Sequence, residues 1–113
     1  MANHISLEKG DQNAVEEFQK RVSRLLGNDL VRLALFGSKL TGKDTSGSDI
    51  DILVLVKDSG MSLKDQIIEA AFEVNIGHGV YISPRVISLS TFNNPVWSQT
   101  PFLRGLRENG LTL

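Results

Sequence analysis

Two aspartates, Asp49 and Asp51, stand two positions apart at the start of a strongly apolar run. Residues two apart on a strand project from the same face of a sheet, so these carboxylates are expected roughly 6 to 7 Å apart on one face. Like charges in that position repel each other unless a cation lies between them. Carboxylate oxygens suit a hard divalent ion such as Mg²⁺ or Mn²⁺, which keeps positions open for water and phosphates. The pair therefore predicts a metal site.

Gly37 and Ser38, at the end of the preceding apolar segment, supply a complementary feature. A glycine at a strand end lets backbone N–H groups approach a phosphate, and the serine hydroxyl adds a donor. A short helix beginning at Ser38 would strengthen this anion site through its N-terminus. A carboxylate pair beside a phosphate-binding turn predicts binding of a nucleoside triphosphate and phosphoryl-type transfer.

Each of these features also has a purely structural explanation. The two carboxylates could be neutralised by Lys39 and Lys43, which stand in the polar loop before them. Gly37 and Ser38 by themselves are typical of an ordinary turn in which the serine caps a helix. The functional interpretation depends on the two features occurring together in one segment.

The residues before this segment predict a helix and a strand. Apolar residues recur at helical spacing over Asn13 to Leu26, where Asn13 can cap the first turn. Gly27 supplies the left-handed residue that ends such a helix. Residues 1–11 are expected to form a loose arm. The alternating segment Asp29 to Phe36 predicts a strand entering a mostly buried sheet.

The residues after the aspartates predict a central strand and a second long helix. The run Ile50 to Val56 is apolar and β-branched, as in a central strand. Ser62 and Asp65 have the spacing of a capping box, and Gly77 and Gly79 are expected to end the helix. The residues of this helix expected to point inward are Leu63, Ile67, Ile68, Ala71, Phe72 and Val74.

The C-terminal third predicts one more strand and a short helix. Val80 to Leu89 reads as a strand in which Pro84 belongs at an edge or a bulge, and Thr100 to Asn109 has the length of a final helix. The large apolar residues expected to cover the open face of the sheet or to meet a partner are Trp97, Phe102, Leu103 and Leu106. We therefore expect a single α/β domain over residues 1–113, with a short, mixed, twisted sheet backed by two helices.

Composition limits the classes of function. The chain has 113 residues and no cysteine, which fits one domain and excludes disulfides and thiolate metal sites. A net charge of −1 gives no general basic field, so direct nucleic-acid binding is not expected. The longest apolar stretch is too short to cross a bilayer, and Met1 to Gly10 lack the apolar core of a signal peptide. A cytoplasmic location without membrane contact is the expectation.

The central segment resembles the signature of the nucleotidyltransferase fold of the DNA polymerase beta superfamily: Gly-Ser, ten residues, and then Asp-Ile-Asp. Its sequence, Gly-Ser-Lys-Leu-Thr-Gly followed by Ser-Asp-Ile-Asp-Ile-Leu-Val, is similar to that of the small prokaryotic branch, the minimal nucleotidyltransferases. The positions that match are Gly37, Ser38, Gly42, Ser48, Asp49 and Asp51. The expected order of helices and strands fits this fold along the whole chain.

The resemblance implies a role for each matching residue. Asp49 and Asp51 would hold Mg²⁺ or Mn²⁺ and act in catalysis, Gly37 and Ser38 would hold the triphosphate of ATP, and Ser48 would make a further phosphate contact. Many members of this branch act as antitoxins of a HEPN-domain ribonuclease toxin by adding AMP to a tyrosine of the toxin. The implied activity is a protein adenylyltransferase that forms a hetero-oligomer with such a toxin.

The chain departs from the superfamily pattern in one respect, which leaves open which group activates the hydroxyl group of the acceptor. The wider superfamily places a third carboxylate on the next strand to activate the attacking hydroxyl, and Val80 to Ser90 contains no Asp or Glu. Ser83, Arg85, His78 or a water could replace it, although Arg85 could equally blunt an edge strand and His78 could be a surface residue. Two other functions remain open: an antitoxin that acts by stoichiometric binding alone, and nucleotidylation of a small molecule such as an aminoglycoside.

Overall fold

The strand predicted from the apolar run after Asp49 is the centre of the fold. In the computed structural model, which describes residues 9–36, 49–101 and 111–113, β2 (Ile50–Val56) lies between β1 (Leu30–Phe36) and β3 (Ile82–Ser88). β1 is antiparallel to β2 and β3 is parallel to it, and β4 (Leu111–Thr112) pairs with the other edge of β1. The sheet is mixed, with the order β3-β2-β1-β4. The predicted α/β class with a short mixed sheet is confirmed.

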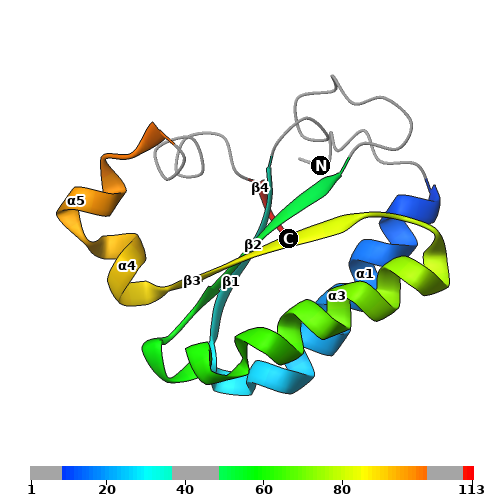
Figure 1. Ribbon diagram of the computed structural model, residues 1–113, viewed down its shortest axis with the longest axis horizontal. Coiled ribbons are helices and arrows are strands. Elements are labelled where there is room, and N and C mark those ends of the chain that lie inside the picture. Colours follow the sequence, from blue (N-terminus) through cyan, green and yellow to red (C-terminus); the bar gives the residue numbers. More distant parts are fainter. Residues whose placement is uncertain (1–8, 37–48, 102–110) are drawn as a thin grey trace.

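Two long helices, α1 (Lys9–Leu26) and α3 (Lys64–His78), lie side by side against one face of the sheet (Figure 1). Every second residue of β2 packs against them. The buried residues at this helix-facing layer include Phe18 and Val22 of α1, Ile67 and Val74 of α3, and Ile50, Ile52, Val54 and Val56 of β2. This layer is the main core of the molecule.

The opposite face of the sheet is partly covered by a shorter segment. Leu53 and Leu55 of β2 project to this face and pack in a second cluster with Ala34 and Phe92. Phe92 belongs to α4 (Leu89–Asn93), which is followed by α5 (Pro95–Ser98). Because β2 is buried on both faces along most of its length, its sequence is almost continuously apolar.

The start of the chain departs from the expected loose arm. α1 begins at Lys9 and not at Asn13, so residues 9–11 are helical, and residues 1–8 lie outside the described part of the chain. At its other end, Gly27 has φ +51°, which confirms the predicted left-handed residue. The short 3₁₀ helix η1 (Gly27–Asp29) then leads into β1.

The predicted capping box of α3 is wrong. The Ser62 hydroxyl donates a hydrogen bond to the carbonyl oxygen of Ser59, 3.2 Å away, inside a 3₁₀ helix η2 (Asp58–Leu63). α3 follows η2 directly, with no side-chain cap on its first turn. Gly60 fixes this turn by close packing, because a Cβ there would lie 3.1 Å from the Cβ of Val56. Tertiary packing of η2 has therefore displaced the local cap.

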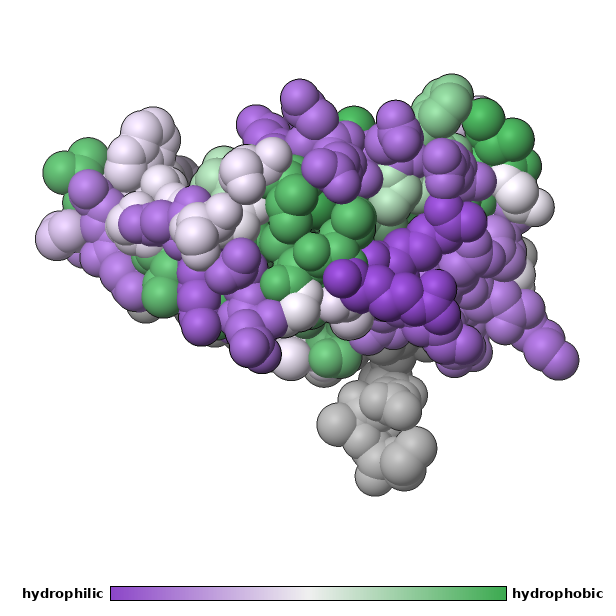
Figure 2. All heavy atoms as spheres, turned by 90° about the horizontal axis from the view of Figure 1, so that it is seen from below, coloured by the Kyte–Doolittle hydropathy of each residue, from purple (hydrophilic) through white to green (hydrophobic). Residues whose placement is uncertain are grey.

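The inward face predicted for α3 is only partly correct. Ile67, Ala71 and Val74 are buried, whereas the side chains of Ile68 and Phe72 are 44% and 62% exposed. Successive helical residues are turned by about 100°, so Ile68 and Phe72 lie to the side of the face that buries Ile67 and Ala71. Together with Ile76, which is also exposed, these residues form an apolar stripe on the outer side of α3. Figure 2, viewed from the helix side, shows hydrophobic atoms interrupting the hydrophilic surface.

Hydrogen bonds of Asn75 join the end of α3 to the edge strand of the sheet. Gly79, with φ +67°, ends α3, while Gly77 lies within the helix and does not end it. The Asn75 side chain accepts a hydrogen bond from the Ile82 backbone N–H at 2.7 Å and donates one to the Ile82 carbonyl oxygen at 3.1 Å. β3 is an edge strand, as Pro84 predicted. The Asn75 amide and the proline both hinder another strand from pairing there.

Candidate active site

The two predicted metal ligands lie on the face of the sheet opposite to α1 and α3. Ile50 and Ile52 point into the helix-facing core, so the alternating residues Asp49 and Asp51 project to the other face. Asp49 is exposed and Asp51 is half-buried. The structure thus places both carboxylates together on the open face, and their role as metal ligands stays a prediction.

The end of β1 lies beside this carboxylate pair. Phe36, the last residue of β1, is the register partner of Asp51 in the antiparallel ladder. The chain therefore leaves β1 directly next to the half-buried aspartate. The predicted phosphate contacts and the neighbouring loop residues lie outside the described residues: Gly37, Ser38, Lys39, Gly42, Lys43 and Ser48.

The strand on the other side of β2 contributes hydroxyl and guanidinium groups. Ser83 is the register partner of Asp51 in the parallel ladder, and Arg85 is the partner of Leu53. Both residues alternate with Ile82, Pro84 and Val86, so they share the face of the carboxylate pair. This face of β3 carries no Asp or Glu, as its sequence predicted.

The electrostatics of the pair suit the binding of a divalent cation. Burial raises the pKa of Asp51 above its ordinary value, the charge of Asp49 raises it further, and the charge of Arg85 opposes both effects. Among the described residues no group of three or more His, Cys, Asp or Glu could hold a metal ion. Two carboxylates with open positions around them are nevertheless the donor set that Mg²⁺ takes when substrate phosphates complete its shell. The residues present therefore fit a divalent ion bound together with a nucleotide.

This electrostatic conflict predicts that Asp51→Asn stabilises the metal-free protein slightly at neutral pH. A carboxyl group whose folded pKa is raised destabilises the fold once the pH exceeds that pKa, and has no such effect below its unfolded pKa. We expect a rise in Tm of at most a few degrees at pH 7 in the presence of a chelator. Thermal unfolding of both proteins at pH 7 and at pH 3 would measure it. A stability gain of equal size at both pH values would contradict the electrostatic explanation.

His78, one candidate for the missing base, lies on the helix side. Its Nε2 atom is 2.9 Å from Oε1 of Glu17 on α1, and the hydrogen bonds from His78 and then Arg21 hold the pKa of Glu17 below its ordinary value. Arg21 also bridges to Glu73 of α3. His78 therefore belongs to a network that joins α1 and α3, and the sheet separates this network from the aspartates.

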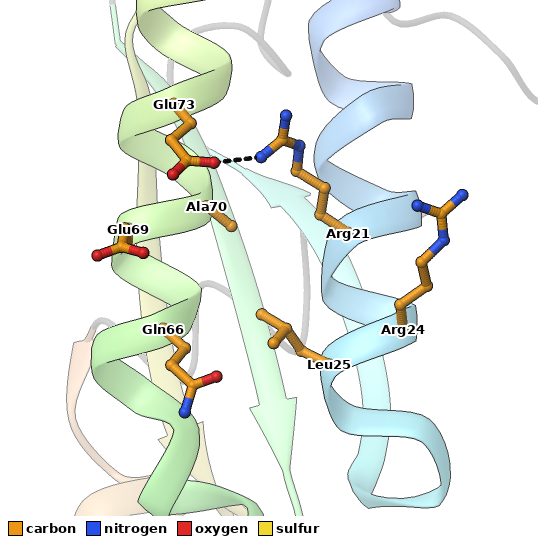
Figure 3. A pocket seen from close by; sticks show the side chains of 7 residues that line it. All are labelled: Arg21, Arg24, Leu25, Gln66, Glu69, Ala70 and Glu73. Atoms are coloured by element: carbon orange, nitrogen blue, oxygen red, sulfur yellow. Dashed lines mark hydrogen bonds and ion pairs between the residues drawn. The ribbon is translucent and has the colours of Figure 1, made fainter.

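A shallow pocket lies between the same two helices (Figure 3). Its lining residues are Arg21, Arg24, Leu25, Gln66, Glu69, Ala70 and Glu73. The pocket opens on the side of the sheet away from Asp49 and Asp51. It holds none of the residues that the sequence singled out for catalysis.

The C-terminal apolar residues are expected to cover the open face of the sheet or to meet a partner, and the exposed Trp97 leaves the second of these possibilities open. Phe92 is buried against the open face of the sheet, whereas the Trp97 side chain is 55% exposed on α5. Asn94 caps α5 by accepting a hydrogen bond from the Val96 backbone N–H at 2.8 Å. The other predicted members of this group lie outside the described residues: Phe102, Leu103 and Leu106.

Tyr81 also lies near the site and is not among the residues predicted from the sequence. Its carbonyl oxygen accepts a hydrogen bond from the backbone N–H of Ile50, 2.7 Å away. Tyr81 is thus beside the residue that separates Asp49 from Asp51. Alternation along the third strand could have indicated it, because Tyr81 stands two residues before Ser83 and residues at that spacing share one face of a sheet.

None of the helices in the described part of the chain is long and apolar enough to cross a bilayer.

Comparison with known proteins matches most of the chain to one family model. The model, described as a nucleotidyltransferase domain, covers residues 15–101. The match includes β1, β2, α3 and β3, and therefore the strands that carry the aspartate pair and its neighbours.

Three proteins of Methanocaldococcus jannaschii, all provisionally named protein adenylyltransferases, are similar to this chain. The first is 37% identical over 62% of this chain and 72% of its own length. The second is 31% identical over 76% of this chain, which spans 64% of that relative. The third is 31% identical over 91% of this chain and 97% of its own length.

Proposed function

The chain belongs to the nucleotidyltransferase domain family, and from that premise we propose that it transfers AMP from ATP to a hydroxyl group of a partner protein. One observation of the structure carries this proposal. Asp49 and Asp51 project together from the open face of β2, beside the end of β1. A triphosphate bound at this pair and an acceptor hydroxyl group beside it would meet on this face of the sheet.

The roles proposed for the residues come from the resemblance to minimal nucleotidyltransferases, and the placement of Asp49 and Asp51 on one face agrees with them. Asp49 and Asp51 would hold Mg²⁺, which when bound neutralises phosphate charge and orients the triphosphate. Gly37, Ser38 and Ser48 would contact the phosphates at the end of β1. Catalysis in this class of reaction is mainly positioning and charge stabilisation, so this small set of groups can be sufficient on the donor side.

The residues of β3 beside the aspartate pair favour a protein as the second substrate. The open face of β3 presents Ser83 and Arg85 where a carboxylate base would otherwise be expected. A partner that brings both the attacking hydroxyl and its surroundings would complete the site. The names of the three relatives, which specify protein adenylyltransferases, favour the same class of acceptor.

We take a HEPN-domain toxin as the partner, so that the chain acts as its antitoxin in a hetero-oligomer. The support for this partner is the resemblance of the Gly37 to Val54 segment to minimal nucleotidyltransferases. Incubation of the chain with labelled ATP, Mg²⁺ and the HEPN protein should label a tyrosine of the toxin. Transfer to an aminoglycoside with none to protein would refute the protein acceptor.

A second candidate function is neutralisation of the toxin by stoichiometric binding. The absence of a carboxylate from the open face of β3 favours it. The Asp49→Asn/Asp51→Asn double variant separates the two functions. Full protection against the toxin by this variant would support binding alone, and loss of protection with retained complex formation would support catalysis.

A further inference from the structure

Tyr81 stands closer to the candidate active site than its place in the sequence suggests. Its neighbours Val80 and Ile82 both pack on the helix-facing core. The side chain between them must therefore project to the opposite face, which is the face of Asp49 and Asp51. There the Tyr81 side chain is 63% exposed.

The register of the parallel strands places Tyr81 next to Asp49. Ile50 pairs with Ile82, so one step earlier Asp49 and Tyr81 are opposite each other. The hydrogen bond of 2.7 Å from the Ile50 N–H to the Tyr81 carbonyl oxygen shows that the pairing continues to this point. Neighbouring strands are about 4.8 Å apart, and aromatic side chains reach even diagonal neighbours across a sheet. The phenol can thus reach the space above the carboxylate pair.

We propose that Tyr81 is an acceptor of the chain's own reaction, so that the protein nucleotidylates itself in the absence of a partner. This inference rests on the proposed nucleotidyl transfer and adds a modification site to it. The Tyr81 hydroxyl oxygen attacks the α-phosphorus of ATP, and the bond from that phosphorus to the pyrophosphate oxygen breaks. Pyrophosphate leaves, the phenolic proton passes to solvent, and the product is a tyrosine ester of AMP.

The chemistry of the two nearby hydroxyl groups favours Tyr81 over Ser83. A phenol is a more acidic hydroxyl group than that of serine, which matters where this face of β3 offers no carboxylate base. Ser83 is also half-buried and has a shorter side chain, whereas Tyr81 is exposed. Tyr81 is the one tyrosine in the sequence, so any tyrosine ester found on this chain identifies the site.

The test is intact-mass spectrometry of the purified chain incubated with Mg²⁺ and ATP, and in parallel with GTP, CTP or UTP, without a partner. We expect a gain of one nucleoside monophosphate, located at Tyr81 by peptide fragmentation. Its rate per molecule should not change when the protein is diluted tenfold, because the acceptor and the site are in one chain. A rate that falls in proportion to dilution would overturn the intramolecular assignment.

Two variants complete the experiment. Tyr81→Phe keeps the ring and should lower self-labelling at least tenfold. Ser23→Ala, the control, removes an exposed hydroxyl group of α1 on the other side of the sheet and should keep self-labelling unchanged. Tyr81→Phe should still label the HEPN partner, which shows that the donor site is intact. Labelling of the partner without self-labelling of the wild type, or persistent labelling of Tyr81→Phe, would overturn this inference and leave the proposed function standing. Labelling of neither protein would overturn both.

Discussion

Asp49→Asn and Asp51→Asn are each expected to lower the rate of nucleotidyl transfer about 100-fold or more. A catalytic divalent ion contributes several kcal/mol of charge stabilisation in the transition state, and each 1.4 kcal/mol corresponds to a tenfold change in rate. The amide of asparagine fits the same space but carries no charge to hold the ion. The measurement is the initial rate of transfer from labelled ATP to the partner protein over a range of Mg²⁺ concentrations.

Asp65→Asn is the matched control for this prediction. Asp65 is exposed in the first turn of α3, on the helix side of the sheet. Its substitution makes the same chemical change away from the site, so it should leave the rate within about twofold of wild type. Full activity of a site variant at low Mg²⁺ would exclude the substituted aspartate as a metal ligand.

Phe18→Ala is expected to destabilise the fold by about 3 to 5 kcal/mol. Phe18 is completely buried where α1 packs on the sheet, so truncation of its ring removes apolar contacts and leaves a cavity. That loss is a large part of the about 5 to 15 kcal/mol available to a typical domain. The free energy of unfolding in urea, followed by circular dichroism, measures it.

Phe72→Ala makes the same chemical change on the exposed stripe of α3. The Phe72 side chain is 62% exposed, so we expect a change of less than about 1 kcal/mol. Phe18→Leu, a milder variant, keeps the comparison measurable if Phe18→Ala fails to fold. Equal destabilisation by the two alanine substitutions would mean that the outer side of α3 is buried in solution.

The sequence determined the centre of the sheet and the most informative part of the site. The run Ile50–Val56 is a strand with the predicted bounds, because it is apolar on both faces and so leaves no helical pattern. The spacing of Asp49 and Asp51 by itself required a common face. Both conclusions depend on neighbours in the chain, which a sequence displays directly.

The orientation of α3 was decided by tertiary packing. Ile67 and Ile68 are adjacent and chemically identical, yet the first is buried and the second is half exposed. Apolar residues occupy too much of this helix for periodicity to select one face. Contact with β2 and α1 made the selection, and packing of η2 around Gly60 displaced the cap predicted at Ser62.

The surroundings of the aspartate pair were decided in the same way. The sequence could list Ser83, Arg85 and His78 as candidates, but it could not rank them by position. The parallel register of β3 on β2 brings Tyr81 and Ser83 to the aspartates, whereas the packing of α3 on α1 brings His78 to Glu17 on the other side of the sheet. Such pairing joins residues far apart in the chain through backbone hydrogen bonds, which most side chains permit and which therefore leave little signal in the sequence. For that reason the donor side of the site can be predicted from local spacing, whereas the acceptor side is defined only by the tertiary structure.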